Sequence, residues 1–201
     1  DLVEIDAASN RGIDEVRSLK EYAYLTPARA RRKTYIIDEI HMMTKDAFNA
    51  LLKILEEPPS HILFIMATTE PEKLLETVVS RTQHFRFRPL AEPVIQKAIE
   101  DVSKKEGINI VKSASATLAF LSDGSLRDGL NHLAQAAAIG GKKIDEKDIE
   151  TVFGMPPAKL AYGMTDAIFS KNIESAYQHI RDLENTGSNP QMLLKILIRN
   201  F

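Results

Sequence analysis

The chain has 201 residues, of which 44% are hydrophobic and 27% are charged, so it can bury a core and lacks the composition of a disordered segment. Its 26 lysines and arginines are balanced by 28 aspartates and glutamates, which excludes binding to nucleic acid through net charge alone, but not through a local basic face. The absence of cysteine excludes disulfides and thiolate zinc sites within these residues. Its apolar runs are too short to span a membrane, and no signal peptide opens the chain, so we expect a cytoplasmic globular protein.

In the first ninety residues, short apolar runs alternate with amphipathic stretches. The patterns predict strands at 2–5, 34–37, 62–67 and 84–87, and helices at 13–24, 45–56 and 72–79. Buried strands that alternate with helices indicate a parallel sheet covered on both faces.

After Pro89 the pattern predicts only helices, at 92–105, 113–122, 127–139, 145–152, 157–170, 172–185 and 190–201. The fold class is therefore α/β followed by all-α, with domains expected at 1–89, 90–153 and 154–201. Asp1 stands inside a predicted strand, and the last helix stops without a capping residue, so we expect a fragment of a longer protein.

The strongest local signal is the acidic pair Asp38-Glu39, which follows the predicted strand at 34–37. Ligands of open parallel sheets bind beyond the carboxyl ends of the strands. In nucleotide hydrolysis, one such carboxylate holds hydrated Mg²⁺ and the next orients or deprotonates the attacking water. From these residues alone, a solvated strand end is an equally good interpretation.

The same acids begin the sequence Asp38-Glu39-Ile40-His41, which matches the DExH box of superfamily 2 helicases. Such helicases place a Q-x-x-G-R-x-x-R run on a second parallel-sheet domain. This chain has no such run, and its helical second half argues against the helicase interpretation.

Two hydroxyls, Thr68 and Thr69, follow the predicted strand at 62–67. Neighbouring strands share one crevice, so either hydroxyl could contact a γ-phosphate or the attacking water. Capping the turn before Glu70-Pro71 is an equally good role for them.

Three arginines are further candidates. Arg81 precedes the predicted strand at 84–87. It could offer its positive charge to the phosphates of a neighbouring subunit, but the residues alone favour an ordinary surface arginine. Arg127 falls in the first turn of a helix that Ser125 is expected to cap, where it could bind an anion or pair with Asp123 or Asp128. Arg11 could meet a DNA phosphate.

A phosphate-binding loop of the form G-x-x-x-x-G-K-[ST] does not occur in the sequence. Gly141-Lys142 is followed by Lys143 and lies five residues after Ala136, so it does not fit the motif. We therefore expect that this chain by itself does not bind ATP tightly.

An ordered set of motifs resembles the gamma/tau subunits of the bacterial DNA polymerase III clamp loader. The set comprises Asp6-Ala7-Ala8-Ser9, Pro27-Ala28-Arg29, Asp38-Glu39-Ile40-His41-Met42, residues 49–59 (NALLKILEEPP), Ala67-Thr68-Thr69, Ser80-Arg81 and Gly124-Ser125-Leu126-Arg127-Asp128. The resemblance is strong to about residue 155 and weak beyond.

The resemblance implies the C-terminal part of an AAA+ ATPase core, a three-helix lid at 90–153 and the start of a helical collar. Asp38 and Glu39 resemble the Walker B acids, and Asp38 would hold Mg²⁺ through water. Thr69, with Thr68 as the alternative, resembles sensor 1, and Arg127 resembles sensor 2. Arg81 matches the arginine finger of the family's Ser-Arg-Cys motif, in which Thr82 here replaces the cysteine. The family's Walker A loop and zinc module would precede Asp1.

The resemblance also implies partners and a function. The parent protein would use ATP and Mg²⁺ to load a sliding clamp onto primed-template DNA, together with delta, delta prime and further gamma/tau copies. Arg11 would then contact a DNA phosphate. One alternative is a subunit or fragment of the same complex that assembles and binds without hydrolysing ATP; another is the DExH helicase.

Overall fold

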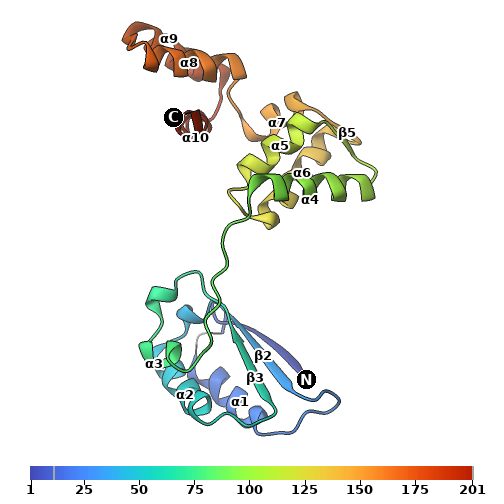
Figure 1. The fold of residues 1–201 in the computed structure, drawn as a ribbon, viewed down its shortest axis with the longest axis vertical. Helices are drawn as coiled ribbons and strands as arrows, with labels where there is room; N and C mark the ends of the chain where they lie inside the picture. Colours follow the sequence, from blue (N-terminus) through green and yellow to red (C-terminus); the bar gives the residue numbers. More distant parts are fainter. Residues whose placement is uncertain (11, 201) are drawn as a thin grey trace. The chain divides into compact units, whose positions relative to one another are not determined.

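A computed structural model describes residues 1–10 and 12–200, and the chain divides into two compact units between Arg86 and Phe87 (Figure 1). The first unit contains a sheet with helices, and the second is mainly helical. None of the helices in the described residues combines the length and the apolar composition that crossing a lipid bilayer requires.

The first unit is built on a parallel sheet of three described strands, β1 (Leu2–Asp6), β2 (Lys33–Asp38) and β3 (Ile62–Met66), with β2 in the middle. The strand predictions at 2–5, 34–37 and 62–67 are thereby confirmed. Helix α1 (Ile13–Ala23) connects β1 to β2, and α2 (Lys45–Glu56) connects β2 to β3. A 3₁₀ turn (Pro71–Lys73) and the short helix α3 (Glu76–Val79) follow β3 in place of one helix at 72–79.

Helix α2 shows how the sequence positions the core of this unit. The Thr44 side chain accepts a hydrogen bond from the Ala47 N–H at 3.3 Å, which caps the first turn. The apolar residues of α2 recur at helical spacing, so one face buries Phe48, Leu51 and Ile54 in the same core as Tyr35 and Ile37 of β2. Burying a side chain such as Leu51 completely contributes about 1.5–3 kcal/mol to stability.

The prediction that both faces of the sheet are covered is wrong for the described residues. Helices α1 and α2 pack against each other on the same face of the sheet. On the other face, Leu63 and Ile65 of β3 remain 40% and 46% exposed. Alternating residues of a strand point to opposite faces, so the strand is half-buried although its composition is almost wholly apolar.

The predicted strand at 84–87 is also absent, because residues 83–91 form neither helix nor strand. Its alternating sequence His84-Phe85-Arg86-Phe87 suits a pleated surface, but no described strand lies beside it. Phe85 and Phe87 are consequently 69% and 92% exposed. The period-2 pattern therefore indicates a preference for β-strand, but a strand forms only where a neighbouring strand is available for pairing.

The second unit contains seven helices among its described residues, close to the seven predicted positions. They are α4 (Glu92–Lys105), α5 (Lys112–Leu121), α6 (Leu126–Gly140), α7 (Glu146–Phe153), α8 (Ala158–Phe169), α9 (Ile173–Thr186) and α10 (Pro190–Asn200). Four of them fall within 90–153, as the residue pattern predicts, against the three helices that the resemblance implies. The sequence did not indicate the parallel pairing of two-residue strands β4 (Asn109–Ile110) and β5 (Lys143–Ile144).

These helices enclose two groups of buried apolar residues. One group, which includes Ile99, Leu118 and Ile149, is shared by helices α4, α5, α6 and α7. The other, which includes Met164 and Leu197, is shared by helices α8, α9 and α10. The expected division at residue 153 falls between the helices of the two groups and stays a prediction.

Gly124, before helix α6, has a backbone that alanine cannot adopt without strain. Its φ is +85°, and a Cβ added there would lie 2.3 Å from the Pro89 Cβ. Gly124→Ala is expected to lower the free energy of unfolding by about 2–4 kcal/mol. Gly107→Ala is the control: its φ is +69° with nothing within 4 Å of the added Cβ, and it should cost about 1–2 kcal/mol. Urea denaturation followed by circular dichroism measures both losses, and equal losses would contradict the close packing of Gly124.

Candidate functional site

Polar residues collect at the edge of the sheet where the three strands end. In the strand register, Asp6 lies opposite Asp38. The Ala67 N–H donates to the Ile37 carbonyl at 2.8 Å, and the Ile40 N–H donates to the Ala67 carbonyl at 3.0 Å. These bonds extend the pairing of β2 and β3 beyond the strands and bring residues 38–41 beside residues 67–70.

Glu39 occupies the turn after β2 in a left-handed conformation, with φ 47° and ψ 45°. This conformation costs a non-glycine residue about 1–2 kcal/mol, and such strain collects at functional sites. Its N–H lies 3.0 Å from Oδ1 of Asp38, whose carboxylate is exposed at the strand end. The next residue, Ile40, is fully buried and begins a 3₁₀ turn (Ile40–Met42), which fixes the turn against the core.

The carboxylate of Glu39 is held by Thr69. Its Oε2 accepts hydrogen bonds from the Thr69 N–H at 3.1 Å and from the Thr69 Oγ1 at 3.1 Å, and its Oε1 lies 3.3 Å from the same hydroxyl. The structure thus joins the second acid of the predicted pair to the hydroxyl that follows the neighbouring strand. Thr68 lies beside them and caps the turn after β3, since its Oγ1 accepts from the Glu70 N–H at 3.0 Å.

His41 completes this group. The side chain is only 7% exposed, and its Nδ1 lies 2.8 Å from Oγ1 of Thr68 and 3.2 Å from Oε2 of Glu39. Its Nε2 lies 3.1 Å from Oε2 of Glu70. The ring therefore contacts both the turn after β2 and the turn after β3.

Glu70 carries a fixed negative charge at the outer side of the group. Lys73 donates to its Oε2 at 2.6 Å, and this hydrogen bond holds the pKa of the Glu70 carboxyl below its usual value, with the positive charge of Lys73 and the nearby His41 adding to the effect. Glu70 therefore stays ionised at neutral pH, and its Oε2 can accept from Nε2 of His41 when that nitrogen carries a proton.

The arrangement suits a site that completes its metal coordination with phosphate and water. The described residues contain no cluster of three or more His, Cys, Asp or Glu that could hold a metal ion by themselves. Mg²⁺ commonly binds one or two protein carboxylates together with substrate phosphates and water, so the exposed oxygens of Asp38 fit this ion. Glu39 and Thr69 beside it supply a proton acceptor and a hydrogen-bond donor for a water molecule.

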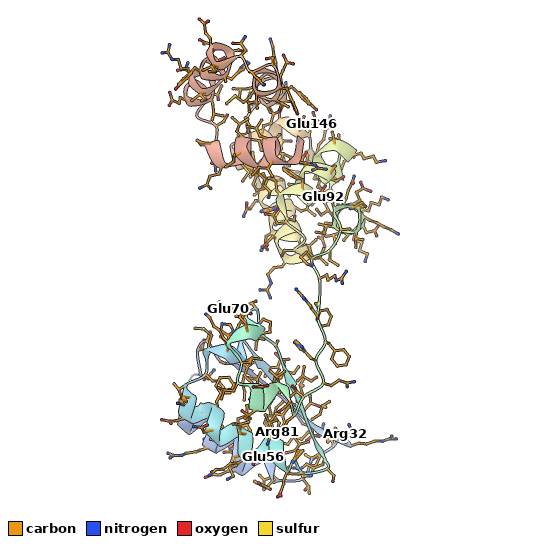
Figure 2. All side chains as sticks on the ribbon, turned by 60° about the vertical axis from the view of Figure 1, so that its left-hand side comes forward. Arg32, Glu56, Glu70, Arg81, Glu92 and Glu146 are labelled. Atoms are coloured by element: carbon orange, nitrogen blue, oxygen red, sulfur yellow. The ribbon has the colours of Figure 1, made fainter. Side chains whose placement is uncertain are left out.

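Arg81 lies after α3, and Figure 2 shows it with Glu56 toward the end of the first unit that is remote from Glu70. Its guanidinium lies 3.2 Å from Oε1 of Glu56 and donates to the Thr77 carbonyl at 2.9 Å, while 38% of the side chain stays exposed. Thr82, which stands where the resembling family has cysteine, donates its hydroxyl to the Val78 and Val79 carbonyls and so closes α3. The structure thus keeps Arg81 at the surface, outside the Glu39–Thr69 group.

Arg127 belongs to the second unit. Ser125 caps α6 by accepting from the Asp128 N–H at 3.2 Å, as the sequence predicts, and Arg127 is exposed in the first turn. Neither Asp123 nor Asp128 pairs with it in the described residues; Asp123 instead contacts Lys195 of α10 at 2.7 Å. The interpretation of Arg127 as part of a local ion pair is therefore wrong. Arg11 lies outside the described residues.

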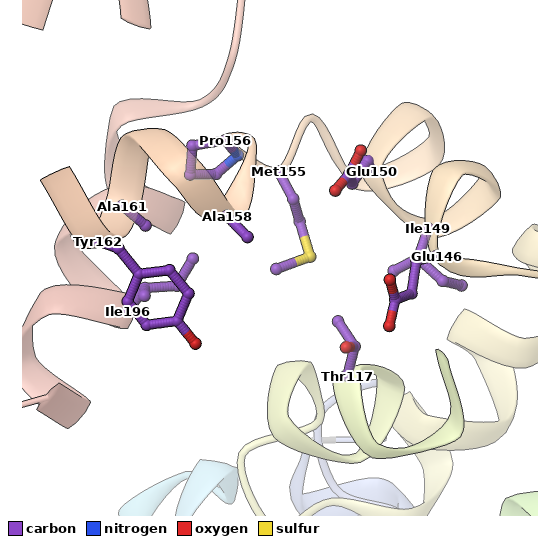
Figure 3. Close-up of a pocket in the computed structure, with 10 residues that line it drawn as sticks. All are labelled: Thr117, Glu146, Ile149, Glu150, Met155, Pro156, Ala158, Ala161, Tyr162 and Ile196. Atoms are coloured by element: carbon purple, nitrogen blue, oxygen red, sulfur yellow. The ribbon is translucent and has the colours of Figure 1, made fainter. Parts of the chain in front are cut away.

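A groove of about 310 Å³ in the second unit does not resemble a phosphate site (Figure 3). Two acidic side chains, Glu146 and Glu150, stand at its wall, and the residues that line it include no lysine, arginine or histidine. The complete lining is Thr117, Glu146, Ile149, Glu150, Met155, Pro156, Ala158, Ala161, Tyr162 and Ile196.

Sequence reasoning missed His41 and Glu70 as members of the site. Strand order predicts that acids and hydroxyls meet at one edge, but the position of the ring depends on the left-handed backbone of Glu39 and on the 3₁₀ turn that follows. A usable signal was the histidine two residues after an acid at a buried strand end.

Comparison with known proteins identifies the family. The family described as "DNA polymerase III, delta subunit" matches residues 1–91. The Bacillus subtilis DNA polymerase III subunit tau is 35% identical over 201 residues, which is 100% of this chain and 36% of that protein. The Mycoplasma genitalium subunit gamma/tau is 39% identical over 198 residues, 98% of this chain and 33% of that protein. The chain thus spans about a third of the length of these relatives.

Among solved structures, the Thermotoga maritima RuvB Holliday junction branch migration motor superposes with a TM-score of 0.65, at 14% identity. The superposition covers 84% of this chain and 59% of that one, and at this identity it establishes the fold alone. The sequence relatives carry the assignment, because they align with almost the whole chain at 33–39% identity in several bacteria. The chain accordingly belongs to the gamma/tau subunit family of bacterial DNA polymerase III.

Proposed function

We propose that the protein acts in the cytoplasm as an ATP-driven subunit of the clamp loader, which places the sliding clamp on primed-template DNA. The observation that carries the proposal is the contact of Glu39 with Thr69 beside the exposed carboxylate of Asp38, at the carboxyl ends of β2 and β3. The relatives, named as DNA polymerase III subunits gamma, tau or gamma/tau, support membership of this machinery.

Each site residue has a proposed role. Asp38 would hold Mg²⁺ through water, and the ion would neutralise charge on the phosphates. Glu39 accepts a proton from the attacking water, and Thr69, with Thr68 as the less favoured candidate, hydrogen-bonds to the water or the γ-phosphate. Arg127 contacts the γ-phosphate at its own site, whereas Arg81 acts on ATP held by a neighbouring subunit.

Hydrolysis requires Glu39 to face a water molecule, and in this structure its carboxylate faces Thr69. Oε2 is held by the N–H and the hydroxyl of Thr69 and lies 3.2 Å from Nδ1 of His41, whereas Oε1 has only the 3.3 Å contact with the Thr69 hydroxyl. A modest rotation of the carboxylate therefore turns Oε1 toward water while Oε2 stays beside the loop. Glu39 is thereby held close to the position where a general base is needed, and nucleotide contacts at Thr69 would favour the release of Oε1.

The proposed partners are delta, delta prime, further gamma/tau copies, the sliding clamp and DNA. Large apolar side chains are exposed on the last three helices, as expected of a collar through which subunits assemble; they are Tyr162, Phe169, Ile173, Tyr177, Leu194 and Ile198. Arg11 is proposed to contact a DNA phosphate. A Walker A loop and a zinc module are proposed for the part of the parent protein before Asp1.

The alternatives differ in what they require. A DExH helicase needs a second parallel-sheet domain, whereas the described part of the second unit is helical apart from the two-residue strands β4 and β5. A subunit that assembles without hydrolysing ATP would keep the collar surface and would need neither Glu39 nor Arg81.

The proposed function is tested by reconstituting the complete protein with its partner subunits. ATP hydrolysis should rise when primed DNA and the sliding clamp are both present, and the clamp should remain on circular DNA after the loader is removed. Hydrolysis that does not respond to clamp and DNA would contradict clamp loading, and assembly without any hydrolysis would support the binding-only alternative.

A further inference from the structure

The buried ring of His41 connects two loops that belong to different strands. Nδ1 contacts Glu39 and Thr68, and Nε2 contacts Glu70. A buried polar side chain whose two nitrogens are both engaged has a fixed orientation, and it fixes the groups that it contacts. Nothing in the roles proposed above uses this ring.

The ring of His41 lies beside the Glu39 carboxylate, so it can limit how far this carboxylate moves. Oε2 of Glu39, which Nδ1 approaches at 3.2 Å, is the oxygen that also accepts from Thr69. The Thr68 hydroxyl, at 2.8 Å from Nδ1, in turn holds the Glu70 N–H and shapes the loop that presents Thr69. Because Nδ1 contacts both Glu39 and Thr68, the ring sets the distance between the Glu39 carboxylate and the loop formed by residues 68–70.

We propose that His41 is a positioning residue for hydrolysis, which holds the Glu39 carboxylate and the Thr68–Glu70 loop in a fixed relation through Nδ1. The effect of His41 on activity rests on the proposed ATP hydrolysis, whereas its effect on the Thr68–Glu70 loop concerns only contacts within the first unit. Glu70, on the Nε2 side, orients the ring.

Two amide side chains separate the contributions of the two nitrogens. The amide of asparagine lies at about the position of Nδ1, and the amide of glutamine reaches about as far as Nε2. His41→Asn therefore keeps a partner for Glu39 and Thr68, and His41→Gln keeps one for Glu70 only. If His41 only filled space, the two substitutions would have similar effects.

The first experiment is amide hydrogen exchange of the 201-residue chain, which does not depend on ATP. The Thr69 N–H, which donates to Glu39, should exchange about fivefold faster or more in His41→Gln and within about twofold of the original rate in His41→Asn. Equal rates in the two variants and the unaltered chain would overturn the proposal. If His41→Gln does not fold, Thr68→Val removes the hydroxyl bound by Nδ1, and Thr68→Ser is its control; an unchanged Thr69 rate in Thr68→Val would likewise overturn it.

The second experiment measures kcat and nucleotide affinity of the complete protein in the assembled complex. His41→Gln should lower kcat by roughly 10- to 100-fold with little change in ATP affinity, and His41→Asn should recover most of that loss. A His41→Gln kcat equal to that of the unaltered protein, in a complex that Glu39→Gln inactivates, would refute the role of His41 alone. A complex without any ATPase activity would refute the proposed function, and the exchange measurement would still decide whether His41 holds the loop.

Discussion

Replacing Glu39 by glutamine is expected to lower the rate of ATP hydrolysis by the complete protein about 100- to 10,000-fold, with ATP binding retained. The amide has nearly the shape of the carboxylate, and its oxygen can still accept from the Thr69 N–H, as Oε2 of Glu39 does at 3.1 Å. It cannot take a proton from water. Single-turnover hydrolysis and the binding of a fluorescent ATP analogue measure the two quantities separately.

The control for this substitution is Glu72→Gln, which makes the same chemical change at an exposed position of the neighbouring 3₁₀ turn. It should leave hydrolysis unchanged, because Glu72 lies outside the Glu39–Thr69 group. Nearly normal hydrolysis in Glu39→Gln would show that another residue is the base. Loss of ATP binding in that variant would show that Glu39 serves binding rather than the chemical step.

Replacing Arg81 by alanine is expected to leave ATP binding at its own site intact and to reduce hydrolysis in the assembled complex about 1,000-fold or more at the site that it serves. The cost to folding should be small, since the Arg81–Glu56 ion pair is largely exposed, with 38% and 53% of the two side chains accessible, and exposed pairs contribute about 0.2–1 kcal/mol. Hydrolysis by the assembled complex and by the isolated subunit gives the comparison.

Glu56→Gln is the matched control for Arg81, because it weakens the same ion pair at 3.2 Å and keeps the arginine. If Arg81 acts on a neighbouring nucleotide, this variant hydrolyses ATP normally. Equal defects in Arg81→Ala and Glu56→Gln would instead assign both residues to the local structure of the first unit. An equal loss in the isolated subunit would contradict action on a neighbour.

Periodicity was sufficient to predict the three paired strands and most of the helices, since each pattern reports how a local segment buries one side. The exception among the helices is 72–79, where the chain forms a 3₁₀ turn and the short helix α3. The helix predicted at 45–56 agrees with the observed bounds to the residue: Pro58 marks its end in the sequence, and the structure shows that the Thr44 side chain caps its first turn. Segment 84–87 was mispredicted because a strand also needs a partner, which local sequence does not reveal.

The candidate site could be predicted in part, because the order of strands and helices in the sequence indicates which strand ends lie together. Adjacent parallel strands end at one edge, so Asp38, Glu39, Thr68 and Thr69 were expected to lie close together, as they do. The contacts of His41 depend on a strained turn at Glu39 and on the cap that Thr68 provides, and neither follows from composition or period. The roles of Arg81 and Arg127 depend on nucleotide and on other subunits and stay predictions.

If the proposed function is right, the carboxyl ends of β2 and β3 form the hydrolytic side of a nucleotide site. The most direct measurement is a crystal structure of the complete protein with Mg²⁺ and a non-hydrolysable ATP analogue. We expect a water within about 3 Å of the Glu39 carboxylate, the γ-phosphate beside Thr69, and Asp38 facing the metal ion. A triphosphate bound elsewhere on the protein, with Glu39 still held by Thr69 and remote from it, would contradict the claim.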